Sequence, residues 1–308
     1  MVITHQPLQS LLCLCREGRG PAAETADKGM NHMGTSVLIL TLNEEANLPG
    51  CLESVGWADD IVVFDSYSTD RTEEIARAAG ARFFQRRFDD YAAQRNAALN
   101  DVDYKYPWVL MLDADERITP ELAQEIRDVL SRSDNDVTLY RIGRKDMFFG
   151  RCLRHCGSVQ VWFGRLGRLG HISVHRAIHE EYHTDGRVGY LQARFVHYPL
   201  NKGLDHWFER CNRYSYMEAA ALIRETQDAL PWRQILTRDP VMRRKALKQL
   251  AYRIPCRPLL VFGYVYLLRA GFLDGLAGLR YCILRSVYEY MIDLKVKEHR
   301  RRTKGLPL

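Results

Sequence analysis

The sequence of 308 residues lacks several features that would assign it to a specialised class of protein. Its eight cysteines form no dense disulfide framework and no secretory signal is recognisable, which favours a reducing cytosol. No apolar run reaches the roughly twenty residues that a membrane-spanning helix needs. Cys152, His155 and Cys156 are not followed by a second Cys/His pair at the usual distance, so we expect no structural zinc site.

Positive charge is concentrated at one end of the chain, although the net charge of the whole is only +6. From Pro240 onward fifteen lysines and arginines stand against four acidic residues, so this tail carries +11 and the remainder −5. Such a tail predicts attraction to an anionic surface, either lipid headgroups or nucleic acid. It holds no recognisable RNA-binding module, so an RNA-binding protein is the weaker alternative and no nucleic-acid partner is expected.

Three regions follow one another along the chain. Residues 1–33 are predicted to be a disordered leader, because their apolar patch is too short for a membrane span and no basic segment precedes it. Met30 and Met33 are alternative translation starts. Residues 34–200 form the main domain, and residues 201–308 form a helical, basic C-terminal region.

The main domain alternates between apolar runs and helical segments. Strands are predicted at Ser36–Leu42, Ile61–Phe64, Ala81–Gln85 and Trp108–Leu112. Helices are predicted between them, and another opens with Thr119 as its cap. This alternation predicts an α/β fold with a Rossmann-like, mostly parallel sheet that has helices on both faces.

Polar residues follow the predicted strands. Thr41, Asn43 and Glu44 come at the end of the first strand, and Asp65 ends the second. In parallel sheets ligands bind beyond the carboxyl ends of the strands, so these side chains should converge on one crevice. The segment Asp113–Asp115 places two carboxylates on one face of extended chain, where both can approach a divalent cation and the diphosphate that it binds.

Four segments of the main domain resemble one family. The runs SVLILTLNEEANLPGCLESV, DDIVVFDSYSTDRTEEIARAAGA, AAQRNAAL and WVLMLDADERITPEL are similar to the family 2 glycosyltransferases with the GT-A fold. The similarity is greatest to the branch that includes lipopolysaccharide-core glucosyltransferases. It covers about Ser36 to Leu200 and continues more weakly into the tail through RAGFLDGLAGL.

The resemblance implies a hexosyltransferase that depends on Mg²⁺ or Mn²⁺ and uses a nucleotide-sugar donor, with UDP as the expected nucleotide. The expected acceptor is the lipopolysaccharide core or another cell-envelope glycan, that is, a glycolipid or lipid-linked glycan. Asp115 is the expected metal ligand. The resemblance assigns the following residues to the nucleotide sugar: Thr41, Asn43, Glu44, Asp65, Arg95 and Asp113. For Arg95 a salt bridge on a helix surface is an alternative.

Inverting members of the family also need a base that takes the proton from the acceptor hydroxyl. The segment Ala177–Glu181 resembles the HE element of this branch, so Glu180 is the candidate base and Glu181 its rival. His197 lies where some relatives provide a further metal ligand, although a buried core histidine is the alternative. These parts predict inversion at the anomeric carbon.

The tail contains the short apolar stretch Pro258–Leu268, which we interpret as a helix in the interface of an anionic membrane. The alternative is a buried helix of a helical subdomain. The protein is therefore expected to be cytoplasmic and peripheral on the inner face of the cell membrane. Two other functions stay open, namely a polyprenyl-phosphate glycosyltransferase and a catalytically inactive nucleotide-sugar-binding scaffold.

Overall fold

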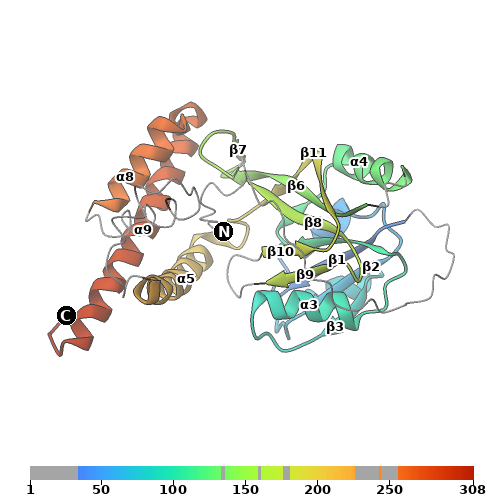
Figure 1. The fold of residues 1–308 in the computed structure, drawn as a ribbon, viewed down its shortest axis with the longest axis horizontal. Helices are drawn as coiled ribbons and strands as arrows, with labels where there is room; N and C mark the ends of the chain where they lie inside the picture. The colour runs from blue at the N-terminus through green and yellow to red at the C-terminus, as the bar shows by residue number, and fades with distance from the viewer. Residues whose placement is uncertain (1–33, 133–135, 159–160, 176–180, 226–242, 244–255) are drawn as a thin grey trace. The chain divides into compact units, whose positions relative to one another are not determined.

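The computed structural model describes residues 34–132, 136–158, 161–175, 181–225, 243 and 256–308. These residues form two compact units, whose elements can be followed in Figure 1. The N-terminal unit holds the described residues up to Arg144 together with residues 161–197, and the C-terminal unit holds residues 145–158 and those from Tyr198 onward. The predicted leader and the candidate base Glu180 lie outside the described residues, and the predicted domain boundary after residue 200 stays a prediction.

One half of the main sheet is parallel and matches the sequence-based expectation. Its strands lie in the order β3-β2-β1-β4 and are joined by helical crossovers. The apolar side chains of β1, β2 and β4 are almost all buried, which explains their nearly continuous apolar sequences. The bounds of these strands are β1 Ser36–Thr41, β2 Ile61–Asp65, β3 Arg82–Gln85 and β4 Trp108–Asp113.

The register of these strands brings their polar ends together. Thr41 lies beside Asp65 of β2, and Leu40 lies beside Asp113 of β4. The predicted convergence of the polar strand ends at one edge of the sheet is thus confirmed for these three strands.

The other half of the sheet makes it mixed rather than purely parallel. Beyond β4 the order continues β8-β6-β11-β5, and β8 is antiparallel to both β4 and β6. From β6 to β11 the strands follow one another in the sequence without the crossover helices that parallel pairing requires. The remaining strands are β5 Glu116–Arg117, β6 Val137–Phe148, β7 Arg151–Leu153, β8 Trp162–Arg168 and β11 Arg187–His197, with a separate hairpin of β9 Ile172–His175 and β10 Glu181–Thr184.

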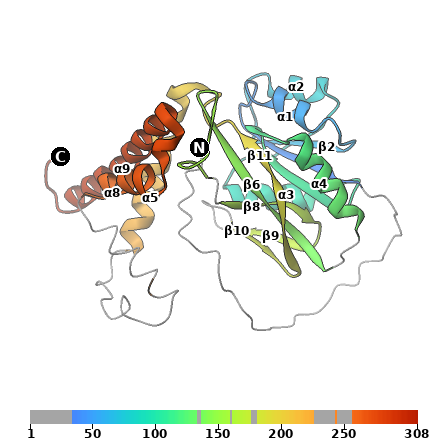
Figure 2. The same ribbon diagram turned by 90° about the horizontal axis from the view of Figure 1, so that it is seen from above.

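Helices cover both faces of the sheet, as predicted. Helices α1 (Leu48–Ser54), α2 (Thr72–Ala78) and α4 (Pro120–Ser131) cover one face, and α3 (Tyr91–Asp101) covers the other beside the β9–β10 hairpin (Figure 2). The cap of α4 is confirmed, since the Thr119 hydroxyl accepts the backbone N–H of Leu122.

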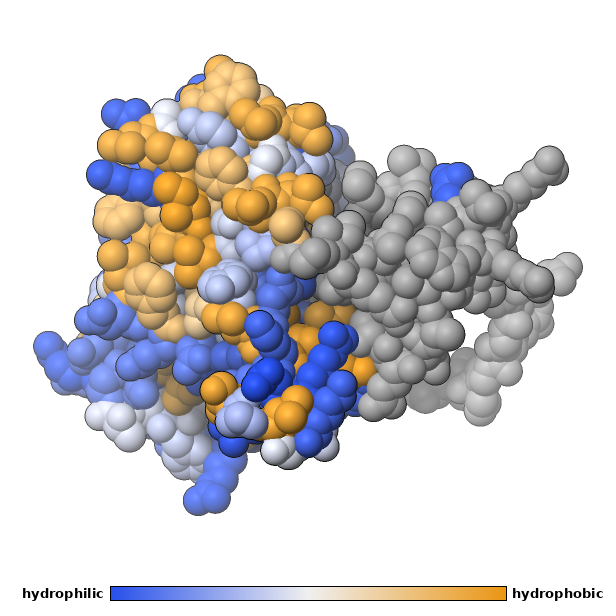
Figure 3. Space-filling view, turned by 90° about the vertical axis from the view of Figure 1, so that its left-hand side faces the viewer, coloured by the Kyte–Doolittle hydropathy of each residue, from blue (hydrophilic) through white to orange (hydrophobic). Residues whose placement is uncertain are grey.

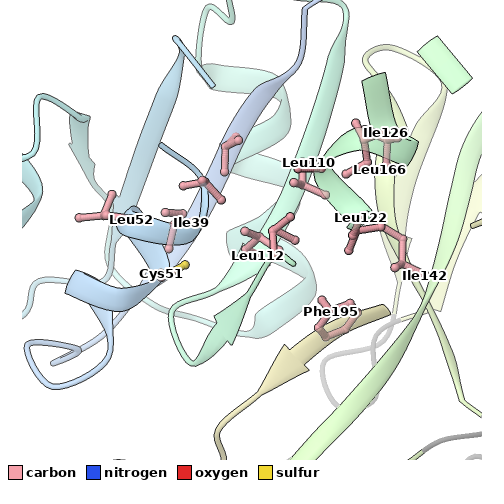
Figure 4. Packing of buried hydrophobic residues seen from close by; sticks show 14 of the residues in the cluster. Ile39, Cys51, Leu52, Leu110, Leu112, Leu122, Ile126, Ile142, Leu166 and Phe195 are labelled. Atoms are coloured by element: carbon pink, nitrogen blue, oxygen red, sulfur yellow. The ribbon is translucent and has the colours of Figure 1, made fainter. Parts of the chain in front are cut away.

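Successive side chains of the central strands point to opposite faces of the sheet and belong to two different hydrophobic clusters. Ile39 and Leu112 point toward α1 and α4, where they meet Cys51, Leu122 and Ile126 (Figure 4). The side chains on the opposite face of the same strands belong to the second cluster. It includes Leu38 of β1, Val109 and Met111 of β4, and Ala98 and Leu99 of α3. Both faces of the central strands are therefore packed, and this rigid layer fixes the strand ends at the site.

The described part of the C-terminal unit from Gly203 onward is helical, as predicted. It contains α5 (Gly203–Glu225), α8 (Arg257–Gly263) and α9 (Gly275–Thr303). Between α8 and α9 lie a π-helical turn, η1 (Tyr264–Leu268), and a 3₁₀ turn, η2 (Gly271–Asp274). Among the described residues no single helix has the length and apolarity of a membrane span, whereas Arg257–Leu268 and Gly271–Thr303 pass that test as a pair bent by 74°.

Small residues permit this bend. Ala270 and Gly275 have φ angles of 57° and 64°, in the left-handed region that favours glycine. A side chain on Gly278 would place its Cβ 2.2 Å from the carbonyl oxygen of Gly271. The segment RAGFLDGLAGL thus has a structural reason for its composition.

Asp274, within that segment, joins the bend to the loop after β7. Its carboxylate accepts the backbone N–H groups of Arg154, His155 and Cys156 at 3.0, 2.9 and 3.0 Å. His155 Nδ1 and Cys156 Sγ also contact it, at 2.9 and 3.1 Å. Two of the three residues that first suggested zinc therefore bind a carboxylate.

Candidate active site

Asp65 is the centre of a hydrogen-bond network at the end of β2. Its fully buried carboxylate accepts the Thr41 hydroxyl at 2.8 Å and the Ser68 backbone N–H at 2.8 Å. The Ser68 hydroxyl and the Gln85 side-chain amide donate to it as well. Asp65 therefore holds the ends of β1, β2 and β3 together, and its contact with the nucleoside stays a prediction.

Asn43 and Glu44 connect the loop after β1 to the loop after β2. Asn43 adopts a φ of 54°, which asparagine tolerates better than most residues. Its backbone N–H donates to the Ser68 hydroxyl at 2.7 Å, and its side-chain oxygen accepts the Thr69 N–H at 2.8 Å. The Glu44 N–H donates to the Thr72 hydroxyl at 2.8 Å. Asn43 and Glu44, which are predicted to bind the nucleotide sugar, thus lie in a loop that hydrogen bonds hold against the loop after β2.

Three consecutive residues of α3 each hold a different segment of the unit. Gln94 donates to the Ser66 hydroxyl in the loop after β2, at 3.1 Å. Arg95 donates to Asp113 at the end of β4, at 2.8 Å. Asn96 bonds both backbone polar groups of Val174 in β9, at 2.7 and 2.9 Å. The Arg95 side chain is only 1% exposed, so the alternative of a salt bridge on the helix surface is wrong.

Asp113 lies between two guanidinium groups. Arg95 contacts one carboxylate oxygen and Arg165 of β8 contacts the other, each at 2.8 Å. The same Arg165 nitrogen lies 2.6 Å from Glu116, whose other oxygen accepts the Asp113 backbone N–H. Arg95, Arg165 and Glu116 are buried, whereas the Asp113 side chain is 39% exposed, and the two arginines balance the charges of the two carboxylates.

The environment moves the pKa values of these two acids in opposite directions. Burial favours the neutral form of Asp113, but Arg165 and Arg95 outweigh it and hold the pKa of this carboxyl below its ordinary value. For Glu116 burial dominates, and with the neighbouring charges of Asp113 and Asp115 it raises the pKa although Arg165 opposes this. Asp113 is therefore an ionised acceptor at neutral pH.

Asp115 and His197 meet at the end of β11. His197 Nε2 lies 3.3 Å from Asp115 Oδ2, and the side chains are 5% and 18% exposed respectively. The antiparallel pairing of β11 with β5, which places His197 beside Glu116, creates this proximity. The structure therefore brings together the two residues that were predicted to bind metal.

The side chains of Asp115 and His197 are suitable ligands for a divalent cation. A carboxylate oxygen and an imidazole nitrogen are both metal ligands, and Mg²⁺ sites commonly combine one or two protein carboxylates with substrate phosphates and water. Among the described residues no cluster of three or more His, Cys, Asp or Glu side chains could hold a metal. Asp115 and His197 would by themselves leave most coordination positions of a divalent cation to water or to substrate oxygens.

Tyr182 connects this centre to the β9–β10 hairpin, which carries Glu181, the second candidate base. Its hydroxyl lies 3.3 Å from Arg165, and the Arg95 guanidinium lies 6.0 Å from the centre of its ring. Its neighbour Glu181 is the first residue of β10, pairs with His175 and is half-exposed. Glu180 immediately precedes this strand in the sequence and lies outside the described residues.

Sequence analysis missed three residues of the centre, namely Arg165, Glu116 and Tyr182. Glu116 could have been suspected, because it extends the acidic run that follows a buried strand. Arg165 belongs to the run GRLGRL, in which Arg168 has the same local sequence. Only the pairing of β8 with β4 distinguishes the two arginines, because it brings Arg165 to Asp113.

Replacing Arg165 by methionine is expected to lower the free energy of unfolding by about 3–5 kcal/mol. The change leaves the buried Glu116 without its cationic partner, and an uncompensated buried charge is strongly destabilising. Lysine should restore part of the loss, since it keeps the charge but not the planar fork. Urea unfolding measures the effect, with Arg168→Met on the same strand as the control. Equal midpoints for wild type and Arg165→Met would show that the cluster does not hold the fold.

The part of the chain that builds this centre is similar to a known protein family, and the chain has relatives among known proteins. The family model described as Glycosyl transferase family 2 matches residues 36–203. The lipopolysaccharide core biosynthesis glycosyltransferase LpsC of Rhizobium meliloti (strain 1021) is 29% identical over 194 residues, which cover 60% of this chain and 70% of LpsC. An uncharacterized glycosyltransferase of Rickettsia typhi is 27% identical over 208 residues, which cover 62% of this chain and 68% of that protein.

A solved structure is similar over a smaller part. It is glucosyl-3-phosphoglycerate synthase from Mycobacterium tuberculosis in complex with Mn²⁺, uridine diphosphate and glucosyl-3-phosphoglycerate. The similarity covers 37% of this chain and 44% of that one, with 22% identity and a TM-score of 0.31. The family match is the broader finding, since it spans more than half of the chain and includes every strand of the sheet. It confirms the resemblance seen in the sequence: the chain belongs to glycosyl transferase family 2.

Proposed function

We propose that this glycosyltransferase moves a sugar, with inversion at the anomeric carbon, from a UDP-linked donor to the lipopolysaccharide core or another cell-envelope glycan. One observation carries the proposal. Asp115 and His197 lie 3.3 Å apart, next to an Asp113 that two arginines keep ionised, at the end of a parallel strand where nucleotides bind in such sheets. The acceptor class rests on the similarity to LpsC, whose name assigns it to lipopolysaccharide core biosynthesis.

Each group has a distinct task in this proposal. The nucleoside is bound by Thr41, Asn43, Glu44 and Asp65. Arg95 and Arg165 hold the Asp113 carboxylate in place, so that it can accept a hydrogen bond from the nucleotide sugar. Asp115 and His197 would hold Mg²⁺ or Mn²⁺, which stabilises the negative charge of the departing diphosphate. Glu180 removes the proton of the acceptor hydroxyl, which attacks the anomeric carbon from the face opposite the diphosphate.

The donor base and the metal requirement can be tested together. UDP-, GDP- and TDP-sugars are incubated with the full-length protein, and release of the nucleoside diphosphate is measured with Mn²⁺, with Mg²⁺ and with excess EDTA. We expect release from a UDP-sugar that either ion supports and EDTA abolishes, because the leaving group needs charge stabilisation. Undiminished release in EDTA would contradict the metal assignment, and release from GDP- or TDP-sugars alone would contradict the expected nucleotide.

A further inference from the structure

The bent helical segment of the C-terminal unit exposes many large apolar side chains. Leu268 is 80% exposed, Leu259 70% and Leu273 61%. Figure 3 shows apolar side chains gathered over one broad area of the surface, with hydrophilic side chains next to it. We define the apolar face as the following exposed residues: Leu259, Leu260, Tyr264, Leu267, Leu268, Phe272, Leu273, Leu276, Ile283, Val287, Tyr290 and Leu294.

The part of this face on α9 follows the helical period. Leu276, Ile283, Val287, Tyr290 and Leu294 are separated by seven, four, three and four positions, so they lie along one side of the helix. A different side of α9 is buried within the unit and includes Ala277, Tyr281, Tyr288, Ile292 and Val296. The helix is therefore apolar on two sides, and only one of them is covered by the protein.

Buried ionic contacts hold α8 against α9 and support the apolar face. The Glu289 side chain is fully buried and contacts Arg257 of α8 and Arg285 of α9. Arg257 also lies 3.4 Å from Asp293. These charges are paired inside the unit, so the face itself can enter an apolar medium without exposing them.

Basic residues adjoin the apolar face at its C-terminal end. Lys297, Arg300 and Arg302 are exposed in the last turns of α9, after Leu294. Arg280 is also exposed and lies on the apolar side of α9 itself, four positions after Leu276 and three before Ile283. Tyrosine, together with lysine and arginine, is typical of segments that lie at the level of lipid headgroups. Apolar side chains bordered by cations match an anionic bilayer, whose interior is apolar and whose surface is negative.

We propose that the apolar face binds the surface of an anionic lipid bilayer, with the leucines of η1, η2 and early α9 among the acyl chains and the basic end of α9 at the headgroups. The seven-residue spacing on α9 alone would also suit a coiled coil with a second copy. The face is wider than such a seam, because it continues over η2, η1 and α8, and basic residues border it. These features favour lipid.

Vesicle flotation of the full-length protein tests the proposal. We compare phosphatidylcholine vesicles with vesicles that also contain phosphatidylglycerol, each at low and high sodium chloride. We expect binding to the anionic vesicles, partial release by salt, and at least about tenfold weaker binding of the double variant Leu268→Asp/Leu273→Asp. Lys297→Gln/Arg300→Gln should weaken binding at low salt only.

Matched variants on α5 provide the control. Leu204 and Tyr216 are also exposed but lie outside the apolar face, so Leu204→Asp/Tyr216→Asp should float like wild type. Circular dichroism checks that each variant is folded. The proposal is overturned if wild type binds neither vesicle or if Leu268→Asp/Leu273→Asp binds unchanged. A dimer without vesicles that Ile283→Asp dissociates would likewise overturn it and identify a contact between copies. The assay needs no sugar transfer, so its outcome is independent of the proposed function.

Discussion

Asp115→Asn should abolish metal-dependent sugar transfer while leaving the fold intact. Asparagine keeps the shape of the side chain beside His197 but loses the charge that a divalent cation requires. A catalytic metal stabilises the transition state by several kcal/mol, so we expect a loss in kcat/KM on the order of 10³-fold. Steady-state kinetics gives this value, and isothermal titration should show that Mn²⁺ no longer strengthens donor binding.

The control for this variant is Asp101→Asn, an exposed aspartate at the end of α3, which should transfer sugar at the wild-type rate. His197→Ala offers a second measurement. If His197 is a ligand, the variant needs a higher Mn²⁺ concentration for half-maximal activity. The metal assignment fails if Asp115→Asn retains unchanged metal-dependent affinity for the donor.

Glu180→Gln is expected to lower turnover by about 10²- to 10⁴-fold, the usual cost of losing a general base. Glutamine is nearly isosteric with glutamate but cannot accept the proton of the acceptor hydroxyl. The proposed function assigns donor binding to other residues, so the affinity for the donor should change far less than kcat. Single-turnover kinetics with saturating donor separates the two effects.

Glu181→Gln is the matched variant for this experiment. Glu181 is half-exposed at the start of β10 and lies 3.9 Å from His183, so its replacement should be mild on both affinity and turnover. Loss of activity in Glu181→Gln alone would make Glu181 the base. Normal activity in both variants would favour an acceptor that needs no base, such as a polyprenyl phosphate.

The parallel half of the fold could be predicted from the sequence because its signals are local. The strands that contain Ile39 and Leu110 are unbroken apolar runs, and their polar ends follow from strand length alone. The cap at Thr119 is likewise a local signal. The GT-A assignment came from the resemblance, and membership of the family confirms it.

The centre of the candidate site could not be predicted in full, because its contacts join distant segments. Arg95 was assigned to the nucleotide sugar by the resemblance alone, with a surface salt bridge as the alternative, because nothing in the local sequence shows that its side chain faces Asp113. Arg165 is separated from Asp113 by 52 positions and from Glu116 by 49. Only the antiparallel pairing of β8 with β4 brings it there, and no periodicity in the sequence reveals that pairing.

In the C-terminal region the sequence alone does not show which apolar residues are exposed. Pro258–Leu268 was noticed because its apolar residues are contiguous. The exposed apolar stripe from Leu276 to Leu294 could not be recognised in the sequence. Apolar residues also occupy the buried side of α9, so the sequence shows no clear helical period of apolar and polar residues. Helix α9 packs against α5 and α8, and this packing distinguishes its buried apolar side from its exposed one.

The pairing of His197 with Glu116 determines when the candidate site can be completed during synthesis. These residues lie 81 positions apart, an interval that takes about 4–16 s at ribosomal speeds of about 5–20 residues per second. During that time the nascent chain carries Asp115 without His197, and for the first 49 positions Glu116 has no Arg165. The contact between Asp115 and His197 can therefore form only after β11, the last strand of the sheet in the sequence, has left the ribosome.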